Sequence, residues 1–298
     1  MEYIKKALSY SEQADLLISR NLLADKTELE EFLRANNYYR LSGYWFHYLN
    51  ENDQFRENTT LEIIKKNYNF DCELRTIIYR QIEFIEINLK TSIIYNFAHN
   101  CGPFGYFDRN NLPNLKDYQY TKLIESFKDV YDKSKEPFVY AFKAKYGDTH
   151  ENLPIWMLSE LMTFGMIMNF YDGMKKRQKK EIALIYNLNS EVLFSWILTI
   201  NTYRNIIAHY GRIWRRQIMM RAQMPSIKYH EDWHTPKPVN MRSVYGILTV
   251  MNFFNNKNTK PNCLRDELNQ LFAKYGEYYQ EDLGFPPNWE NGNLWNKS

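Results

Sequence analysis

The sequence predicts an all-α fold, and three observations support this prediction. Apolar residues recur at three- and four-residue steps through most of the 298 residues, whereas alternating, strand-like patterns are rare. Prolines gather between these periodic stretches, where they separate helices. Apolar residues make up 44% of the chain, which is enough to form a buried core and excludes a disordered protein.

Residues 1–60 are expected to form an N-terminal helical segment. Short helices are predicted around Ser11–Asn21 and Thr27–Asn36, and an aromatic stretch follows over residues 37–49. Residues 61–225 are expected to form the central helical domain, and residues 226–298 a helical tail that packs on it. The chain contains no internal repeat and no low-complexity tract.

One long helix is predicted over residues 61–98, because apolar side chains form a stripe along one face. The stripe consists of Leu74, Ile78, Ile82, Ile85, Leu89 and Ile93. Gly102 and Pro103 are expected to end this helix. Residues 100–153 predict a looser insert with one helix near Asp117–Tyr131.

Further helices are predicted over residues 154–171, opened by Pro154, and over residues 190–216, with Ser190 as N-cap. Between them, the basic run over residues 175–180 is interpreted as a solvated helix end or a loop. In the tail, helices are expected near Val239–Asn255 and Cys263–Tyr275. Residues 284–289 are expected to form an irregular strap that packs back on the body.

Charge is distributed unevenly along the chain, although the formal net charge is only +3. No acidic residue occurs between Glu191 and Glu231. The basic residues there are Arg204, His209, Arg212, Arg215, Arg216, Arg221, Lys228 and His230. A segment of one sign creates a local positive field, which favours an anionic partner such as a phosphate group.

Composition also argues against several classes of protein. The three cysteines, Cys72, Cys101 and Cys263, have neither metal-ligand spacing nor a disulfide pattern, which fits a reducing cytoplasm. The N-terminus lacks the apolar region of a signal peptide. The longest apolar run, Val192–Ile200, is far shorter than a membrane span. We expect a cytoplasmic protein that needs neither a membrane nor a bound metal or cofactor.

The candidate site lies on a predicted helix over Thr199–Arg216. At about 100° per residue, Asn205, His209, Arg212 and Arg216 share one polar stripe, and the long side chain of Arg204 reaches it from the edge. If Gly211 ends the helix, the placement of Arg212 and Arg216 on this stripe fails.

These residue types suit RNA cleavage, because RNA carries its own nucleophile in the 2′-hydroxyl group. Histidine moves protons near neutral pH, and arginine holds a phosphate without losing its charge. Arg204, Asn205 and His209 are therefore the predicted catalytic residues. The predicted RNA-binding residues are Arg212, Arg215, Arg216 and Arg221.

An Arg and a His at this spacing also occur by chance. In the simpler interpretation, His209 is an ordinary surface or core histidine and Arg204 is a salt-bridge partner. Glu86 and Lys90, four residues apart on the long helix, are most simply an intrahelical salt bridge. A role for Glu86 in orienting Arg204 or His209 is the alternative.

Four stretches carry a likeness that runs in order along nearly the whole chain. They are Tyr38-Tyr39-Arg40-Leu41-Ser42-Gly43-Tyr44-Trp45 with Phe70-Asp71, Leu74-Arg75 and Ile85-Glu86-Ile87; Leu153-Pro154-Ile155-Trp156 with Phe164-Gly165; Tyr203-Arg204-Asn205-Ile206-Ile207-Ala208-His209 with Arg212-Ile213-Trp214; and Leu283-Gly284-Phe285-Pro286-Pro287-Asn288-Trp289. In these stretches the sequence resembles the Abi family of phage abortive-infection proteins, of the AbiD/AbiF type.

This resemblance implies a HEPN-like helical bundle, with additional N-terminal and C-terminal helical segments, whose Arg-x-x-x-x-His motif cuts RNA. It further implies a homodimer in which two copies of the motif meet. Some members of the family are paired with a small non-coding RNA that restrains them. Where the family pattern has an arginine near the end of the Glu86 helix, this chain has Lys90, to which we assign no catalytic role.

Three functions remain open from the sequence. The first is an RNase toxin in phage defence, with RNA as its substrate and a regulatory RNA as a partner. The second is a non-catalytic module that holds a structured small RNA on the same basic stripe. The third is a protein-interaction module whose aromatic surface binds a partner.

Overall fold

The computed structural model describes residues 2, 6–257 and 262–296, and over these residues it confirms the all-α prediction. This part of the chain contains thirteen α-helices and six short 3-10 helices. Its only β-type pairing consists of two isolated bridges, Leu23 with Thr60 and Leu49 with Phe55.

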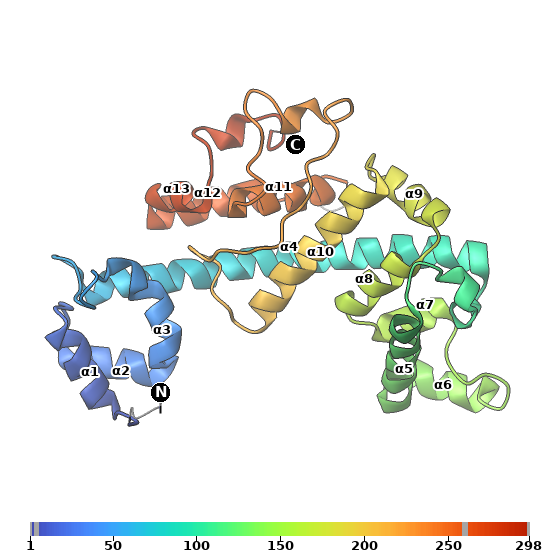
Figure 1. Cartoon of the computed structure of the whole chain (residues 1–298), viewed down its shortest axis with the longest axis horizontal. Coiled ribbons are helices and arrows are strands. Elements are labelled where there is room, and N and C mark those ends of the chain that lie inside the picture. The colour runs from blue at the N-terminus through green and yellow to red at the C-terminus, as the bar shows by residue number, and fades with distance from the viewer. Residues whose placement is uncertain (1, 3–5, 258–261, 297–298) are drawn as a thin grey trace.

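Helix α4, Leu61–Cys101, is the central element (Figure 1). Its 41 residues give it a length of about 60 Å. The Thr60 hydroxyl caps its start by accepting from the Ile63 N–H, and Gly102, at φ +78°, ends it. The predicted long helix is therefore confirmed. Its predicted apolar stripe is buried and packs against helices from every other part of the chain.

Two groups of helices lie near opposite ends of α4 (Figure 1). The N-terminal group contains α1, Tyr10–Ser19; α2, Lys26–Asn36; and α3, Tyr38–Trp45. The second group contains α5, Asp117–Lys133; α6, Pro137–Tyr146; α7, Ile155–Leu158; and α8, Phe164–Gly173. The two groups leave the middle of α4 free for other helices.

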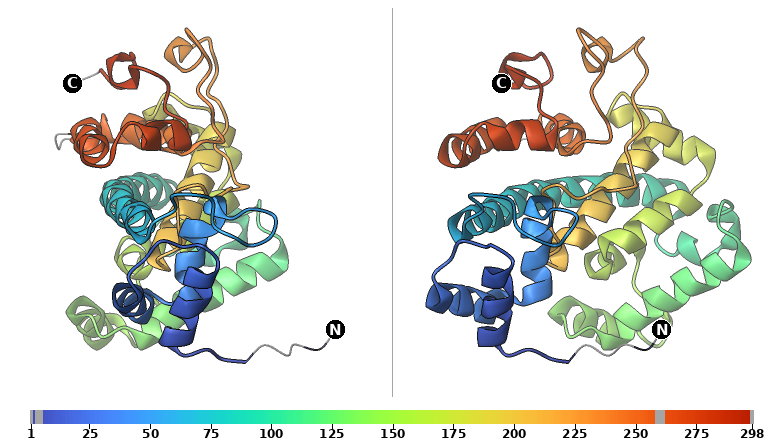
Figure 2. Two further views of the ribbon diagram at one scale, coloured as in Figure 1. Left: turned by 90° about the vertical axis from the view of Figure 1, so that its left-hand side faces the viewer. Right: turned by 60° about the vertical axis from the view of Figure 1, so that its left-hand side comes forward.

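That middle region is covered by the C-terminal half of the chain. After α9, Lys176–Ile185, helix α10, Ser190–Ala208, crosses α4. The C-terminal helices α11, Val244–Asn255; α12, Leu264–Tyr275; and α13, Tyr278–Leu283 form a layer. Figure 2 shows this layer on the opposite side of α4 from α1, α2, α5 and α6. Helix α4 thus holds together all three predicted segments, whose boundaries remain a prediction.

Several predicted element boundaries were wrong. The helix predicted over residues 154–171 is broken, because Met162 is extended and the Thr163 hydroxyl caps a new helix by accepting from Met166 N–H. The insert contains a second helix, α6, which begins at Pro137. Asn189, and not Ser190, caps α10 by accepting from Val192 N–H. Each error concerns a local start signal, either a side-chain cap or the Pro137 that opens α6, which apolar periodicity does not detect.

The predicted strap at the C-terminus is confirmed. Phe285 and Trp289 are buried, and their rings contact Phe272 of α12. The basic run over residues 175–180 opens α9, which agrees with its interpretation as a helix end. Among the described residues, no single helix has the length and apolar composition needed to cross a membrane; α9 and α10 satisfy this test only as a pair bent by 75°.

Candidate functional site

The site is built on the C-terminal end of α10, which comes earlier than predicted. The N–H of Gly211 donates to Ile206 O at 2.7 Å, and the N–H of Tyr210 donates to Ile207 O at 2.8 Å. This pair of bonds, with Tyr210 at φ +55°, is the Schellman arrangement that ends helices. The predicted helix to Arg216 is therefore wrong beyond Ala208. Arg212 and Arg216 do not continue the polar stripe.

The three predicted catalytic residues lie together at this helix end. Tyr203 and Ile207 are buried beneath them, whereas Asn205 and His209 are exposed and Arg204 is half-exposed. Asn205 and His209 are four residues apart, so they share one face. Within the described chain, neither of their side chains has a hydrogen-bond partner. The three side chains are open to a ligand, so of the simpler interpretation only the core histidine is excluded.

Arg204 faces Glu86 of α4, and its Nε lies 3.9 Å from the carboxylate Oε2. Lys90 instead pairs with Glu160, with 3.6 Å between Nζ and Oε1. The predicted intrahelical bridge between Glu86 and Lys90 is therefore not among the ion pairs of the described residues. Burial raises the pKa of Glu86, and the nearby charges of Arg204 and Lys90 partly oppose this rise. Glu86 is thus placed to orient Arg204.

A buried carboxylate fixes the chain directly after the helix end. Asp71 of α4 is fully buried, and its Oδ1 accepts from Ile213 N at 2.9 Å and from Trp214 N at 2.7 Å. Its Oδ2 accepts from the Tyr44 hydroxyl at 2.7 Å and from the Arg75 guanidinium. We call these groups the Asp71 cluster. They join α3, α4 and the segment after α10, so the position of His209 depends on all three.

Two of the four predicted RNA-binding arginines are used inside the protein. Arg212 Nη1 lies 3.2 Å from His47 Nε2, and burial first, then the charges of Arg215 and Arg212, lower the pKa of His47. The neutral imidazole therefore accepts this bond. Gly43 leaves room for the Arg212 side chain, because a Cβ atom at position 43 would lie only 3.2 Å from the Arg212 Nε. Arg215 forms two bonds to Asp282, at 2.9 and 2.7 Å.

The other two predicted arginines remain on the surface. Arg216 lies beside Gly211, and Arg221 lines a pocket farther along the chain. Both side chains are exposed, and neither has an ion-pair partner among the described residues. These two arginines are therefore available to an anion.

Sequence reasoning missed the role of Asp71 and of Tyr44. One signal was present, because Asp71 and Arg75 are four residues apart and therefore lie on one helix face with opposite charges. Nothing in the sequence shows that Tyr44 and Trp214 meet there. Among the described residues, no group of three or more His, Cys, Asp or Glu side chains is arranged to hold a metal ion.

Fold and site together define an all-helical protein that presents an Arg, an Asn and a His at the end of one buried helix. The family model of the Abi-like proteins matches residues 31–215, which include the Asp71 cluster and Arg204 through His209. The chain therefore belongs to the Abi-like family, which associates it with phage abortive infection. No curated protein and no solved structure gave a significant match to the chain.

Proposed function

We propose that this protein is an endoribonuclease of the HEPN type that acts in phage abortive infection. The observation that supports the proposal most directly is the placement of Arg204, Asn205 and His209 side by side at an accessible helix end. Membership of the Abi-like family supports the defence role. The AbiD/AbiF type is part of the same proposal.

The proposed reaction is a transesterification that needs no metal ion. The 2′-oxygen of one ribose attacks the adjacent phosphorus, and the bond from phosphorus to the 5′-oxygen breaks. The 2′-hydroxyl proton is lost and the 5′-oxygen gains a proton, which leaves a 2′,3′-cyclic phosphate and a 5′-hydroxyl. His209 moves these protons, because imidazole titrates near neutral pH.

Arg204 stabilises the charge that builds on the phosphate as phosphorus becomes pentavalent. Its planar guanidinium holds two phosphate oxygens at once. Glu86 limits the freedom of Arg204 before the substrate arrives. Asn205, on the same face as His209, orients the imidazole or the phosphate by hydrogen bonds.

We also propose that two copies of the chain form a homodimer, because a second Arg and His would double the charge and the proton-transfer groups at one phosphate. A small non-coding RNA is the proposed regulatory partner, held by exposed arginines such as Arg216. Light scattering of the purified protein tests the dimer. Sequencing of the nucleic acid that copurifies with it tests the RNA partner.

Alanine variants of the site test the proposed reaction. We expect Arg204→Ala and His209→Ala each to lower RNA cleavage by about 10² to 10⁴-fold, because each removes a group that acts in the transition state. Cleavage of a labelled RNA in EDTA, with end-group analysis for the cyclic phosphate, is the measurement. His99→Ala is the matched control, since His99 is also exposed and bonds only its own helix at Tyr95 O.

Undiminished cleavage by a clean His209→Ala preparation would rule out this assignment. RNA binding without cleavage by the parent protein would instead favour the non-catalytic RNA-binding module. A parent protein that purifies without nucleic acid and does not bind added RNA would exclude both.

A further inference from the structure

A pocket lies beside α10, away from the three catalytic candidates. One wall is α10 itself, through Glu191, Phe194, Ser195 and Leu198. The opposite walls are the chain after α10, residues 220–224, and the turn before α11, residues 238–242. The cavity volume is about 940 Å³, which is large enough for a nucleotide.

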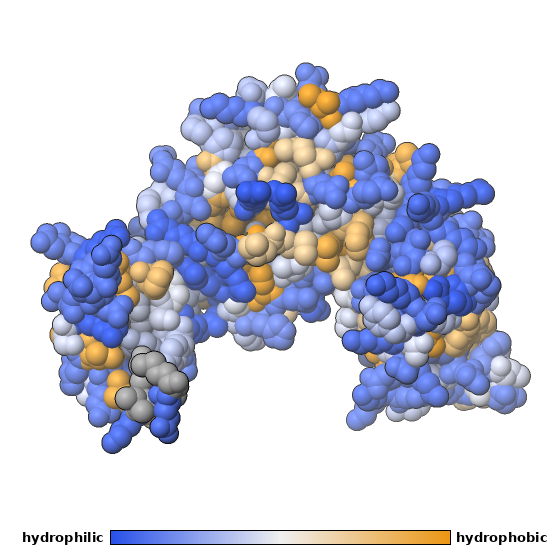
Figure 3. Space-filling view, in the orientation of Figure 1, coloured by the Kyte–Doolittle hydropathy of each residue, from blue (hydrophilic) through white to orange (hydrophobic). Residues whose placement is uncertain are grey.

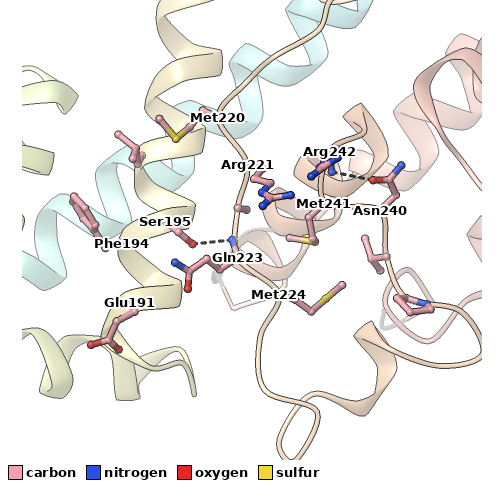
Figure 4. Close-up of a pocket in the computed structure, with 14 residues that line it drawn as sticks. Glu191, Phe194, Ser195, Met220, Arg221, Gln223, Met224, Asn240, Met241 and Arg242 are labelled. Atoms are coloured by element: carbon pink, nitrogen blue, oxygen red, sulfur yellow. Dashed lines mark hydrogen bonds between the residues drawn. The ribbon is translucent and has the colours of Figure 1, made fainter.

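The pocket is formed by a fixed arrangement of the backbone. The Gln223 N–H donates to the Ser195 hydroxyl at 2.9 Å, and the Trp196 indole donates to Gln223 O at 2.7 Å. These bonds hold residues 220–224 alongside α10, as Figure 4 shows. Asn240 Oδ1 accepts from Arg242 N at 3.1 Å, which shapes the facing turn. The pocket therefore does not depend on a ligand to form.

Two guanidinium groups line this pocket without a partner of opposite charge. Arg221 and Arg242 come from different walls, and Figure 4 shows Arg221 extending toward the turn that carries Arg242. Both are exposed, and neither has an ion-pair partner within the described chain. Glu191, the acidic residue of the lining, lies at the other end of the pocket in Figure 4. Two unpaired arginines facing one cavity favour a phosphate group between them.

Besides the polar side chains of Ser195, Gln223 and Asn240, the rest of the lining is apolar and adaptable. Met220, Met224 and Met241 line the cavity from two walls, and Phe194 lines it from α10. Figure 3 shows apolar surface gathered near the centre of the face on which α10 and the following segment lie. Thioethers contact the edges and faces of aromatic rings without a fixed geometry, so this lining accepts a flat base of any identity.

The pocket shares a helix face with the catalytic candidates. Leu198 precedes Asn205 by seven residues, close to two full turns, so the two side chains point within about 20° of each other. Accessible residues recur at three- and four-residue steps along this face of α10 and its C-cap: Glu191, Phe194, Leu198, Thr202, Asn205 and His209. The rise from Leu198 to His209 is about 16 Å. A short length of single-stranded RNA spans that distance.

We propose that this pocket binds a nucleotide of the RNA strand that is being cut, at a position near the scissile phosphodiester. Its phosphate lies between Arg221 and Arg242, and its base packs against the three methionines. The pocket then fixes the strand along α10 and presents a neighbouring phosphodiester to His209. This inference rests on the proposed ribonuclease function and adds that the substrate is single-stranded and held at a second point.

Binding measurements in the His209→Ala background separate the pocket from cleavage. We expect the Arg221→Ala/Arg242→Ala variant to bind an unstructured, fluorescein-labelled RNA about tenfold more weakly by anisotropy. The slope of log affinity against log salt should fall by about one, because one phosphate contact is lost. The matched control is Lys122→Ala/Lys128→Ala on α5, which removes the same charge from exposed positions outside the pocket.

Two further measurements identify the ligand. An RNA carrying 4-thiouridine should crosslink to residues 220–224 or 240–242, as mapped by mass spectrometry. With His209 intact, the double variant should cleave a long, unstructured RNA with a higher KM than the parent protein. The change in KM should be smaller for a dinucleotide, which spans only the scissile bond.

If the Arg221→Ala/Arg242→Ala variant binds RNA as tightly as the parent protein, the proposed role of the pocket in RNA binding is wrong, whereas the ribonuclease proposal is unaffected. An equal loss in the lysine control would also overturn it, because the effect would then be one of total charge. If AMP binds as tightly as RNA does, the occupant of the pocket is a free nucleotide, which would contradict the proposal that the pocket holds part of an RNA strand. A parent protein that does not bind RNA at all would overturn the pocket and the ribonuclease together.

Discussion

The pairing of Arg204 with Glu86 shows how one half-buried carboxylate controls a candidate catalytic group. The Arg204 Nε and Glu86 Oε2 atoms lie 3.9 Å apart, so the two side chains attract each other electrostatically but form no hydrogen bond. An incoming phosphate can therefore compete for the guanidinium. Glu86 holds Arg204 near its working position and still permits the exchange of one anion for another.

The raised pKa of Glu86 makes stability depend on pH. A carboxyl group with a raised folded-state pKa binds its proton more tightly in the folded protein than in the unfolded chain. Its stabilising contribution is present below the ordinary value of 4.5 and is lost as pH rises through the folded-state pKa. Glu86→Gln should remove this part of the pH dependence, as measured by urea unfolding at a series of pH values from 4.5 upward.

Glu83→Gln is the matched control for the loss of one carboxylate on the same helix, since Glu83 is exposed one turn away. Loss of the ion pair with Arg204 shifts the stability of Glu86→Gln at every pH where the carboxylate is charged, so the trend with pH is the quantity to compare. If the parent protein and Glu86→Gln lose stability in parallel as pH rises, the half-buried carboxyl group of Glu86 does not contribute to the pH dependence of stability.

At the scale of elements, the end of α10 decides where His209 points. His209 is the C-cap residue, and the following Tyr210 adopts the left-handed conformation that glycine usually supplies at this position. The Tyr210 side chain is 71% exposed, so it is not packing that holds the backbone there. The two bonds of the Schellman arrangement and the Asp71 cluster hold it.

Substitutions at Tyr210 should separate the backbone from the side chain. Tyr210→Val should lower the free energy of unfolding by about 1 kcal/mol or more relative to Tyr210→Gly, because a β-branched residue is strained at positive φ. Tyr210→Gly should be at least as stable as the parent protein. Urea unfolding monitored by circular dichroism measures both variants, and equal stability of the Val and Gly variants would contradict the described helix end.

At the scale of the whole molecule, the Asp71 cluster joins the N-terminal helices, the central helix and the segment that leaves the site. Asp71 is separated from Ile213 by 142 residues, and from Tyr44 by 27. A second connection runs from the tail, where Asp282 accepts from the Trp214 indole at 2.9 Å and also binds Arg215. The segment after α10 is therefore fixed from both ends of the chain.

Asp71→Asn should destabilise the protein by about 3–5 kcal/mol, because it leaves the Arg75 charge buried without its partner. The control is Asp15→Asn, whose pair with Lys26 is exposed to solvent and should contribute little to stability. Urea unfolding measures both. If Asp71→Asn does not fold, Tyr44→Phe, which removes one donor, should still cost about 1 kcal/mol. Unfolding midpoints equal to that of the parent in both variants would contradict the cluster.

Apolar periodicity was enough to predict the helical class and the long central helix, because these depend on which side chains leave water. It was also enough to place Arg204, Asn205 and His209 on one helix, since four residues span one turn. Such local relations require no knowledge of the rest of the fold. The family likeness added the order of the motifs along the chain.

Tertiary contacts decided the rest, because they depend on distances through space between residues far apart in sequence. The partner of Arg204 proved to be Glu86, and Arg212 and Arg215 proved to bind His47 and Asp282 instead of facing solvent. The pocket with Arg242 exists only because three separate segments meet. A sequence determines which groups must be paired or buried, but only the packed chain determines which partner each group meets.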